Sequence, residues 1–520
     1  MHIFLINVFL VCEDDDGQTY MQGNSWTTMV NGKLKRCTCG GEGMGAYTCS
    51  ITMENTFLVV ADGHQIHKIS LFEGDVYRRD YISNLPGTAV ALAIDKSNNA
   101  IFWTDVGNGN AGIYKAQLDI GTTNTGTRFV RGDIHEPNGI AIDWLSKNVI
   151  WSDAQLGAIF MVDKYGKNRR RLISGLSEPR SIAVDPLVGA LFWTDYADGT
   201  VNFCAMSGHF DPLKAHHYDQ TARFLTLYNY GKWPNQLVLD PQYKNMIDSE
   251  NYYNGMIYWI DGGKRTIEQI DYIGNNHNIL LNFNHMFNMD GNAVPAFGLA
   301  LHNDDLYFSP WHQTDGTIYS ISRDGSSGLT AISRGISPRP FGMAIVFDYM
   351  QQKDKGHQGN FCESNRHHCS HLCVNAGSED GYECTCPSLS GLVIGPDGRN
   401  CVTPDEFLLV TSLTEGTVSL IPTKVQGIPV SSNGTEFAER TVVAQSVRPS
   451  AVAFDPMEQR IYWSDVALNR IYRQYLNGTF QGIFLEDSIG TVDGIAIDWN
   501  NRLLFFRYVN TSLSMSSILN

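Results

Sequence analysis

The chain has 520 residues, of which 43% are hydrophobic and 11% aromatic. These fractions are sufficient for packed cores, so they exclude a disordered chain, and the length predicts roughly three to four domains. The formal net charge of −16 at pH 7 argues against nucleic acid and anionic membranes as partners and favours a basic partner.

The chain begins with an apolar tract from Met1 to Cys12. We interpret residues 1–11 as a short secretion signal, and a buried strand is the alternative. The sequence contains no apolar run of about 18 residues, so we expect no transmembrane helix within it.

The eleven cysteines fall into two clusters, with Cys204 alone between them. Even, dense clusters that flank a long cysteine-poor stretch predict small disulfide modules in an oxidising compartment. Zinc binding is the alternative, but no Cys-x2-Cys pair supports it. We expect Cys204 to be a buried free thiol, with an intermolecular disulfide as the alternative.

A repeat dominates the middle of the chain. An Asp that ends one apolar run is followed ten residues later by an Asp that ends an aromatic–Trp run, at Asp95–Asp105, Asp143–Asp153 and Asp185–Asp195. A fourth copy, Asp240–Asp261, carries an insertion. Each unit holds about four short β runs, which is typical of a propeller blade.

Degenerate copies complete the ring. Residues 57–71 resemble a blade from its second strand onward, and Phe308 replaces the Trp in another copy. Residues 340–348 form an orphan first strand, which we expect to pair with 57–62 and close a six-bladed propeller over residues 54–350.

These repeats resemble the YWTD propellers of the LDL-receptor family, which also occur in nidogen. The resemblance implies that the motif aspartates link neighbouring strands and blades and that the aromatic residues pack between blades. An aspartate at the end of an apolar strand must be hydrogen-bonded if it is buried, which agrees with a structural role.

Residues 362–401 resemble an EGF-like module. The segment HCSHLCVNAGSEDGYECTC carries the match, and the preceding residues lack the pattern that calcium binding needs. The resemblance implies three disulfide pairs: Cys362–Cys373, Cys369–Cys384 and Cys386–Cys401.

Residues 12–49 resemble a fibronectin type I module through their Cys-x-Cys pair, Gly-rich turn and aromatic spacing. The implied pairs are Cys12–Cys39 and Cys37–Cys49. Such a module would bind extracellular matrix or fibrin-like partners, and a simple disulfide spacer is the alternative.

After Cys401 the repeat begins again, and residues 405–520 hold about two and a half blades. We interpret the chain as a fragment of a longer protein whose membrane anchor lies downstream; an alternatively ended form is the other interpretation. Three sequons in this segment predict N-glycosylation at Asn433, Asn477 and Asn510.

No nucleophile elbow, His-Glu-x-x-His helix or P-loop occurs, and no histidines have metal-ligand spacing. We therefore expect no enzyme activity, no cofactor and no metal. A propeller hydrolase would need a central metal, which the sequence does not offer.

Binding is the better hypothesis. Loops before each inner strand and after each Trp-containing strand meet at one end of a propeller, where aromatic residues and an Arg resemble a protein-binding hot spot. The alternative is that these aromatic residues only cap the core. The predicted ligand-binding residues are Asn138, Arg180, Tyr196, Trp233, Asn235, Phe297 and Trp311.

Two further motifs carry weaker hypotheses. Arg131-Gly132-Asp133 could bind an integrin if exposed, although a solvated turn is the default. Ten histidines between His64 and His312 could release ligand at endosomal pH, as histidines of LDL-receptor relatives do.

The sequence therefore predicts an all-β protein: a six-bladed YWTD propeller, small disulfide-rich modules and an incomplete second propeller. The resemblance implies an extracellular or cell-surface region of an LDL-receptor-related endocytic or Wnt co-receptor-like receptor. Its partners would be lipoprotein-, Wnt-antagonist- or laminin-like secreted proteins. A secreted, nidogen-like matrix protein that binds laminin is the alternative.

Overall fold

The structure is a computed structural model. It describes residues 11–13, 19–21, 25–30, 33–39, 47–51, 56–71, 78–107, 109, 111–118, 126–130, 134–208, 224–241, 255–283, 295–311, 316–336, 339–347, 362, 368–375, 381–388, 390–414, 416–426, 428–429, 441–486, 490–508 and 514–519. Side chains are described from residue 56 onward, except at 78–79, 241, 428–429 and 514–516. Among the described residues, no helix is long and apolar enough to cross a membrane.

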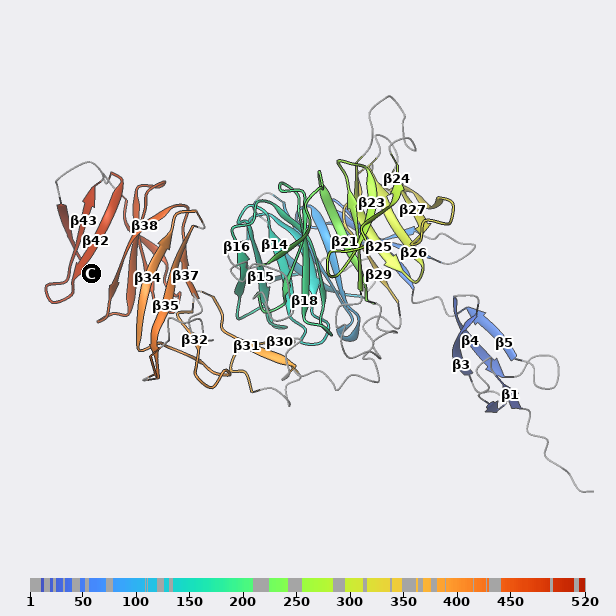
Figure 1. Cartoon of the computed structure of the whole chain (residues 1–520), viewed down its shortest axis with the longest axis horizontal. Helices are drawn as coiled ribbons and strands as arrows, with labels where there is room; N and C mark the ends of the chain where they lie inside the picture. Colours follow the sequence, from blue (N-terminus) through green and yellow to red (C-terminus); the bar gives the residue numbers. More distant parts are fainter. Residues whose placement is uncertain are drawn as a thin grey trace, which may run out of the picture.

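Six four-stranded antiparallel sheets form the first propeller within the described residues (Figure 1). Five of them are meanders in chain order. From the inner strand outward, blade one contains β9 (Ala89–Asp95), β10 (Ala100–Asp105), β11 (Gly112–Gln117) and β12 (Thr127–Val130). Blade two contains β13 (Pro137–Ile142), β14 (Val149–Asp153), β15 (Ala158–Val162) and β16 (Arg170–Ser174). Blade three contains β17 (Pro179–Asp185), β18 (Ala190–Asp195), β19 (Thr200–Ala205) and β20 (Leu225–Tyr228). Blade four contains β21 (Pro234–Pro241), β22 (Gly255–Asp261), β23 (Thr266–Asp271) and β24 (Asn278–Asn282). Blade five contains β25 (Ala296–His302), β26 (Asp305–Pro310), β27 (Gly316–Ser322) and β28 (Thr330–Ile336). Blade six contains β29 (Met343–Val346), β6 (Phe57–Asp62), β7 (Gln65–Ser70) and β8 (Arg78–Ile82).

The sixth blade closes the ring with both ends of the propeller sequence. Strand β29 pairs antiparallel with β6, in a register that sets Met343 opposite Val60 and Val346 opposite Phe57. The inner strands contact one another in blade order, and β29 also contacts β9 of blade one. The predicted closure is confirmed, and no inner strand is left at the end of an open ring.

The second strand of each blade supplies the core because it is covered by a blade on either side. All six residues of β10 are buried, as are all six of β18. The four motif tryptophans, Trp103, Trp151, Trp193 and Trp259, each have 0% exposure. Trp103 stacks on Tyr114, and Trp151 stacks on Phe160 in the adjacent strand of the same blade. Phe308, with 0% exposure, fills the position of the missing tryptophan in blade five.

The second module, residues 362–401, is held by three disulfides: Cys362–Cys373, Cys369–Cys384 and Cys386–Cys401. These are the three pairs implied by the EGF-like resemblance. We call it the three-disulfide module. Its strands are β30 (Leu372–Asn375), β31 (Tyr382–Thr385), β32 (Val393–Ile394) and β33 (Cys401–Val402).

The three-disulfide module packs against blades two and three. Leu372 and Val374 are buried in a cluster that includes Ile150 and Trp193. The Asn148 side chain donates to the Cys373 carbonyl over 2.8 Å. The module is therefore held against the propeller by an apolar contact and a hydrogen bond.

The incomplete second propeller follows. Its first sheet contains β34 (Glu406–Ser412), β35 (Thr417–Val425), β36 (Ile428–Pro429) and β37 (Thr441–Gln445). The next two sheets contain β38 (Pro449–Asp455), β39 (Arg460–Asp465), β40 (Arg470–Tyr475) and β41 (Gly482–Leu485), then β42 (Val492–Asp498), β43 (Leu503–Tyr508) and β44 (Ser514–Ile518).

Five strands form two small sheets in the N-terminal module: β1 (Val11–Glu13) with β2 (Thr19–Met21), and β3 (Ser25–Val30), β4 (Lys33–Cys39) and β5 (Tyr47–Ile51). The β4–β5 register sets Cys37 opposite Cys49. Residues 1–10 and the side chains of Cys12, Cys37, Cys39 and Cys49 lie outside the described part, so the secretion signal, the pairing and the fibronectin type I assignment stay predictions. Cys204 is a buried free cysteine, as expected.

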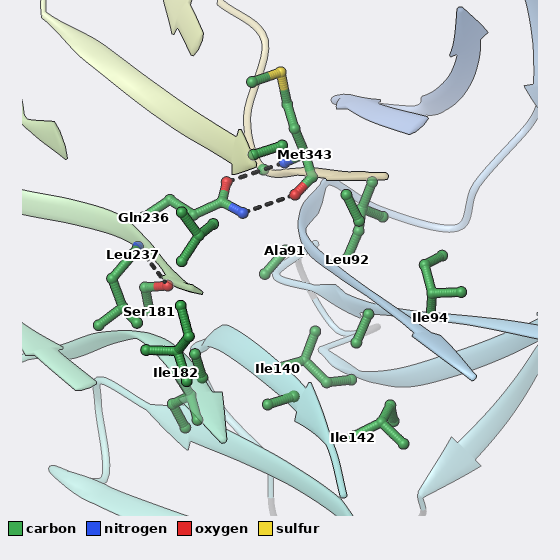
Figure 2. Close-up of a pocket in the computed structure, with 18 of the residues that line it drawn as sticks. Ala91, Leu92, Ile94, Ile140, Ile142, Ser181, Ile182, Gln236, Leu237 and Met343 are labelled. Atoms are coloured by element: carbon green, nitrogen blue, oxygen red, sulfur yellow. Dashed lines mark hydrogen bonds between the residues drawn. The ribbon is translucent and has the colours of Figure 1, made fainter. Parts of the chain in front are cut away.

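Gln236 joins three blades across the central channel (Figure 2). Its Oε1 accepts the N–H groups of Leu299 (3.1 Å) and Met343 (3.0 Å), and its Nε2 donates to the Met343 carbonyl (2.7 Å). The channel-facing edge of β29 has no strand beside it, so the Gln236 amide supplies the bonds of a neighbouring strand.

We expect Gln236→Met to lower the free energy of unfolding by about 2 kcal/mol, because three hydrogen bonds are lost while bulk is kept. Urea unfolding followed by tryptophan fluorescence measures it. Ser181→Ala is the matched control, since Ser181 Oγ accepts a single bond, from the Leu237 N–H (3.1 Å). Its cost should be about 1 kcal/mol. Equal losses in the two variants would contradict the special role of Gln236.

Candidate functional site

The motif aspartates hold the loops at one end of the propeller. Asp153 accepts the N–H groups of His135 (2.8 Å) and Glu136 (3.1 Å), which lie just before the inner strand of its own blade. In blade four, Asp261 accepts the N–H groups of Lys232 (2.7 Å) and Trp233 (3.1 Å). A buried motif carboxylate therefore fixes the predicted binding loops of blades two and four, whereas blade five, with Phe297 and Trp311, has Pro310 at this position.

Burial of these carboxylates has an electrostatic cost. Desolvation raises the pKa of Asp195, while the N–H groups of Glu178, Asp198 and Ser177 stabilise its ionised form. Three donated bonds explain how a carboxylate with 1% exposure is tolerated beside an apolar strand.

The predicted site residues form two aromatic clusters at this end, which we call the end face. In the first cluster, the Arg180 guanidinium lies 3.8 Å from the ring centre of Tyr196. Tyr196 stacks on Trp233 with centroids 6.1 Å apart and planes 15° apart. Trp233 is 42% exposed, and Lys232 Nζ lies 5.1 Å from its ring centre. This layered stack presents an aromatic surface to solvent.

The second cluster is more enclosed. Phe297 and Trp311 stack with centroids 5.8 Å apart and planes 3° apart, and Phe341 meets both rings edge-on. The Trp311 indole N–H donates to the Pro340 carbonyl over 2.7 Å. The enclosed cluster therefore connects blade five to the loop that leads into blade six.

Asn235 joins the two clusters through hydrogen bonds. Its Nδ2 donates to the Ala296 carbonyl (2.8 Å), and its Oδ1 accepts from Arg180 Nη1 (3.2 Å). Glu178 binds the other terminal nitrogen of Arg180 over 3.0 Å. The guanidinium is thus held in place before any ligand arrives.

Two of the predicted residues are buried. Asn235 is 5% exposed and Phe297 is 7% exposed. Asn235 is buried because its amide satisfies a backbone carbonyl of the next blade. Phe297 is buried because Trp311 and Phe341 cover its ring.

A cavity of about 380 Å³ runs between the inner strands below the end face (Figure 2). Asn138, Arg180, Asn235 and Phe297 line it. Its wall is mostly apolar, with Leu92, Ile140 and other inner-strand side chains. The Asn138 Nδ2 is buried without a hydrogen-bond partner, so it is available to a group that enters the cavity.

The sequence reasoning missed Gln236 and Phe341. The repeat itself held the signal: the position of Gln236 is small in the other copies, at Ala91, Gly139, Ser181, Gly298 and Gly342. Phe341 precedes such a glycine, as Phe297 does. A Cβ on Gly139 would lie 2.0 Å from the Arg180 carbonyl oxygen, which explains the small residue there.

Arg131-Gly132-Asp133, Asn433 and Asn510 lie outside the described residues, so the integrin hypothesis and these two glycosylation sites stay predictions. The His67 side chain lies inside blade six, 2.8 Å from Asp62, so its contact is structural. The hypothesis that histidines release ligand at acidic pH stays a prediction. Within the described residues, no group of three or more His, Cys, Asp or Glu could hold a metal ion.

The fold and end face define a closed six-bladed β-propeller of the YWTD type, followed by a three-disulfide module. The chain is 25% identical over 419 residues to low-density lipoprotein receptor-related protein 5 of Mus musculus, covering 80% of this chain and 23% of that protein. For the Homo sapiens protein of the same name, identity is 26% over 419 residues, with the same coverage. The chain is therefore a distant homologue that spans about a quarter of these relatives.

No family model matches the chain. Among solved structures, one described as a nidogen/laminin complex contains a chain with 22% identity and a TM-score of 0.44, covering 56% of this chain and 98% of that chain.

We expect Asn235→Ala to lower the free energy of unfolding by about 2 kcal/mol, because the Ala296 carbonyl and Arg180 Nη1 both lose the hydrogen bond that Asn235 makes. Trp233→Ala should cost less than about 1 kcal/mol, since this side chain is half exposed. Thermal unfolding of both variants measures the difference. A larger loss for Trp233→Ala would show that the aromatic stack supports the fold.

Proposed function

We propose that the chain is an extracellular, non-catalytic ligand-binding region of an LDL-receptor-related endocytic or Wnt co-receptor-like receptor. Its end face binds secreted protein ligands. The observation that carries this proposal is the exposed stack of Arg180, Tyr196 and Trp233 above an apolar cavity. Rigid aromatic and Arg side chains are the residues that dominate binding energy in protein interfaces.

The arrangement favours a peptide segment over a flat protein surface. The cavity below the stack can take one side chain, and the unpartnered Asn138 amide offers a hydrogen bond there. Arg180 is already held by Glu178 and Asn235, so little side-chain entropy is lost on binding. An extracellular location is supported by the three disulfides and by the distant homology to the LDL-receptor-related proteins.

The test is a binding scan of the full secreted chain against Wnt antagonists, lipoproteins and laminin. We expect Trp233→Ala to raise Kd by roughly 30-fold, the equivalent of a hot-spot loss of about 2 kcal/mol. Laminin as the sole ligand would favour a matrix role over a receptor role.

Tyr165→Ala is the matched control for this scan. Tyr165 is 69% exposed and lies 5.3 Å from Lys164 Nζ, an environment much like that of Trp233 beside Lys232. It follows β15, whose last residue Val162 pairs with Val149 at the opposite end of the blade from Asp153. Equal losses for the two variants, or none for Trp233→Ala, would refute the end face as the binding site.

A further inference from the structure

Phe480 is the most exposed large hydrophobic side chain among the described residues, at 82%. It also has a positive φ of 55°, a conformation that bulky residues rarely adopt. It lies between β40 and β41 of the second propeller, far in sequence from the end face. Single exposed hydrophobic residues are common on protein surfaces, but a positive φ at a phenylalanine indicates a constrained turn.

The turn that precedes Phe480 is tightly ordered. The Tyr475 N–H donates to the Thr479 carbonyl (3.0 Å), and the Gly478 N–H donates to the Tyr475 carbonyl (2.9 Å). These bonds bring the two ends of the turn together, and the Tyr475 and Phe480 rings meet edge-to-face with centroids 5.7 Å apart. Asn477 therefore belongs to a turn that is flanked in the chain by the contacting residues Tyr475 and Phe480.

Asn477, Gly478 and Thr479 form a glycosylation sequon in this turn. The Thr479 N–H (3.1 Å) and hydroxyl (2.7 Å) both donate to Asn477 Oδ1. The amide is thereby oriented through its oxygen, and the nitrogen is the atom left for modification. Asn477 is exposed, as a glycosylation acceptor must be.

The two aromatic rings differ in how much surface they offer. The Arg460 guanidinium lies 4.4 Å from the ring centre of Tyr475, and its Nη2 donates to the Tyr475 hydroxyl over 2.8 Å. Arg460 therefore covers one face of Tyr475, whereas the ring of Phe480 is open to solvent.

We propose that Asn477 carries an N-linked glycan whose first sugar packs on the ring of Phe480. In the transfer, Asn477 Nδ2 forms a bond to C1 of the sugar, the bond from C1 to the diphosphate of a lipid-linked oligosaccharide donor breaks, and the amide proton leaves with the lipid diphosphate. The apolar C–H face of the sugar then removes aromatic surface from water.

The first test is occupancy. The full chain is secreted from mammalian cells, and tryptic peptides are analysed by mass spectrometry after enzymatic deglycosylation in heavy-oxygen water. We expect the heavy-oxygen label at Asn477 in most of the protein, and loss of the glycan in Thr479→Ala. An unmodified Asn477 in secreted protein would overturn the proposal without affecting the end-face function, which is tested by ligand binding.

The second test asks whether the sugar contacts Phe480. Glycans on the secreted chain are trimmed to a single sugar, and the thermal transition of the second propeller is compared among wild type, Asn477→Gln, Phe480→Ser and the double variant. We expect Asn477→Gln to lower Tm by about 2 °C when Phe480 is present and by less than about 0.5 °C when Ser replaces it.

The two backgrounds separate packing from a general effect of glycosylation. An equal fall in Tm with Phe480 and with Ser at this position would show that the sugar does not pack on the ring. The proposed contact between the glycan and Phe480 would then be wrong.

Discussion

The rest of the structure depends on the buried aspartate that ends the second strand of a blade. An ionised carboxylate in an apolar core is costly, and it is tolerated only if backbone N–H groups surround it. Asp153 and Asp261 obtain those groups from the loops that enter their own inner strands. The hydrogen bonds that stabilise the carboxylate thus also fix the loop, and the loop carries the binding side chains. In blades two, three and four, one electrostatic requirement therefore also positions the loops of the end face, whereas blade five has Pro310 in place of the aspartate.

The sequence was sufficient to predict the fold because the repeat encodes it several times. A degenerate copy, such as the one with Phe308 in the tryptophan position, can be recognised by comparison with the regular copies. The first strand near Met343 had no second strand after it, and residues 57–62 had no first strand before them, so the two could be paired. The site was harder to predict, since its residues occur once each. Whether Asn235 faces solvent depends on a carbonyl of the next blade, and whether Phe297 is covered depends on Phe341, 44 positions later in the chain. These contacts are set by three-dimensional neighbours and leave no periodic signal.

The three-disulfide module contacts blade two at its first motif aspartate, whose partners differ from those of the same aspartate in blades one and four. In blades one and four, the first motif aspartate is paired with a cation from the following blade: Asp95 with Lys147 over 3.1 Å, and Asp240 with Arg323. Asp143 has no such cation among its contacts, and burial raises its pKa. It is bonded instead by Leu145 and Ser146, and by Asn375 of the module over 3.4 Å. The module therefore adds a polar partner from outside the propeller to those that blade two itself provides.

The net charge of −16 favours a basic partner when the chain is considered as a whole. The end face carries charges of both signs, because Arg180, Lys232 and Arg339 lie beside its aromatic rings and Glu178, Asp195 and Asp261 lie close to them. Arg180 forms an ion pair with Glu178 over 3.0 Å. Charges farther than about 8 Å are largely screened at physiological salt, so a ligand at this face experiences the charged groups around the stack more than the distant ones. Total charge describes the solubility and long-range field of the molecule, whereas the residues around the stack decide which segment binds.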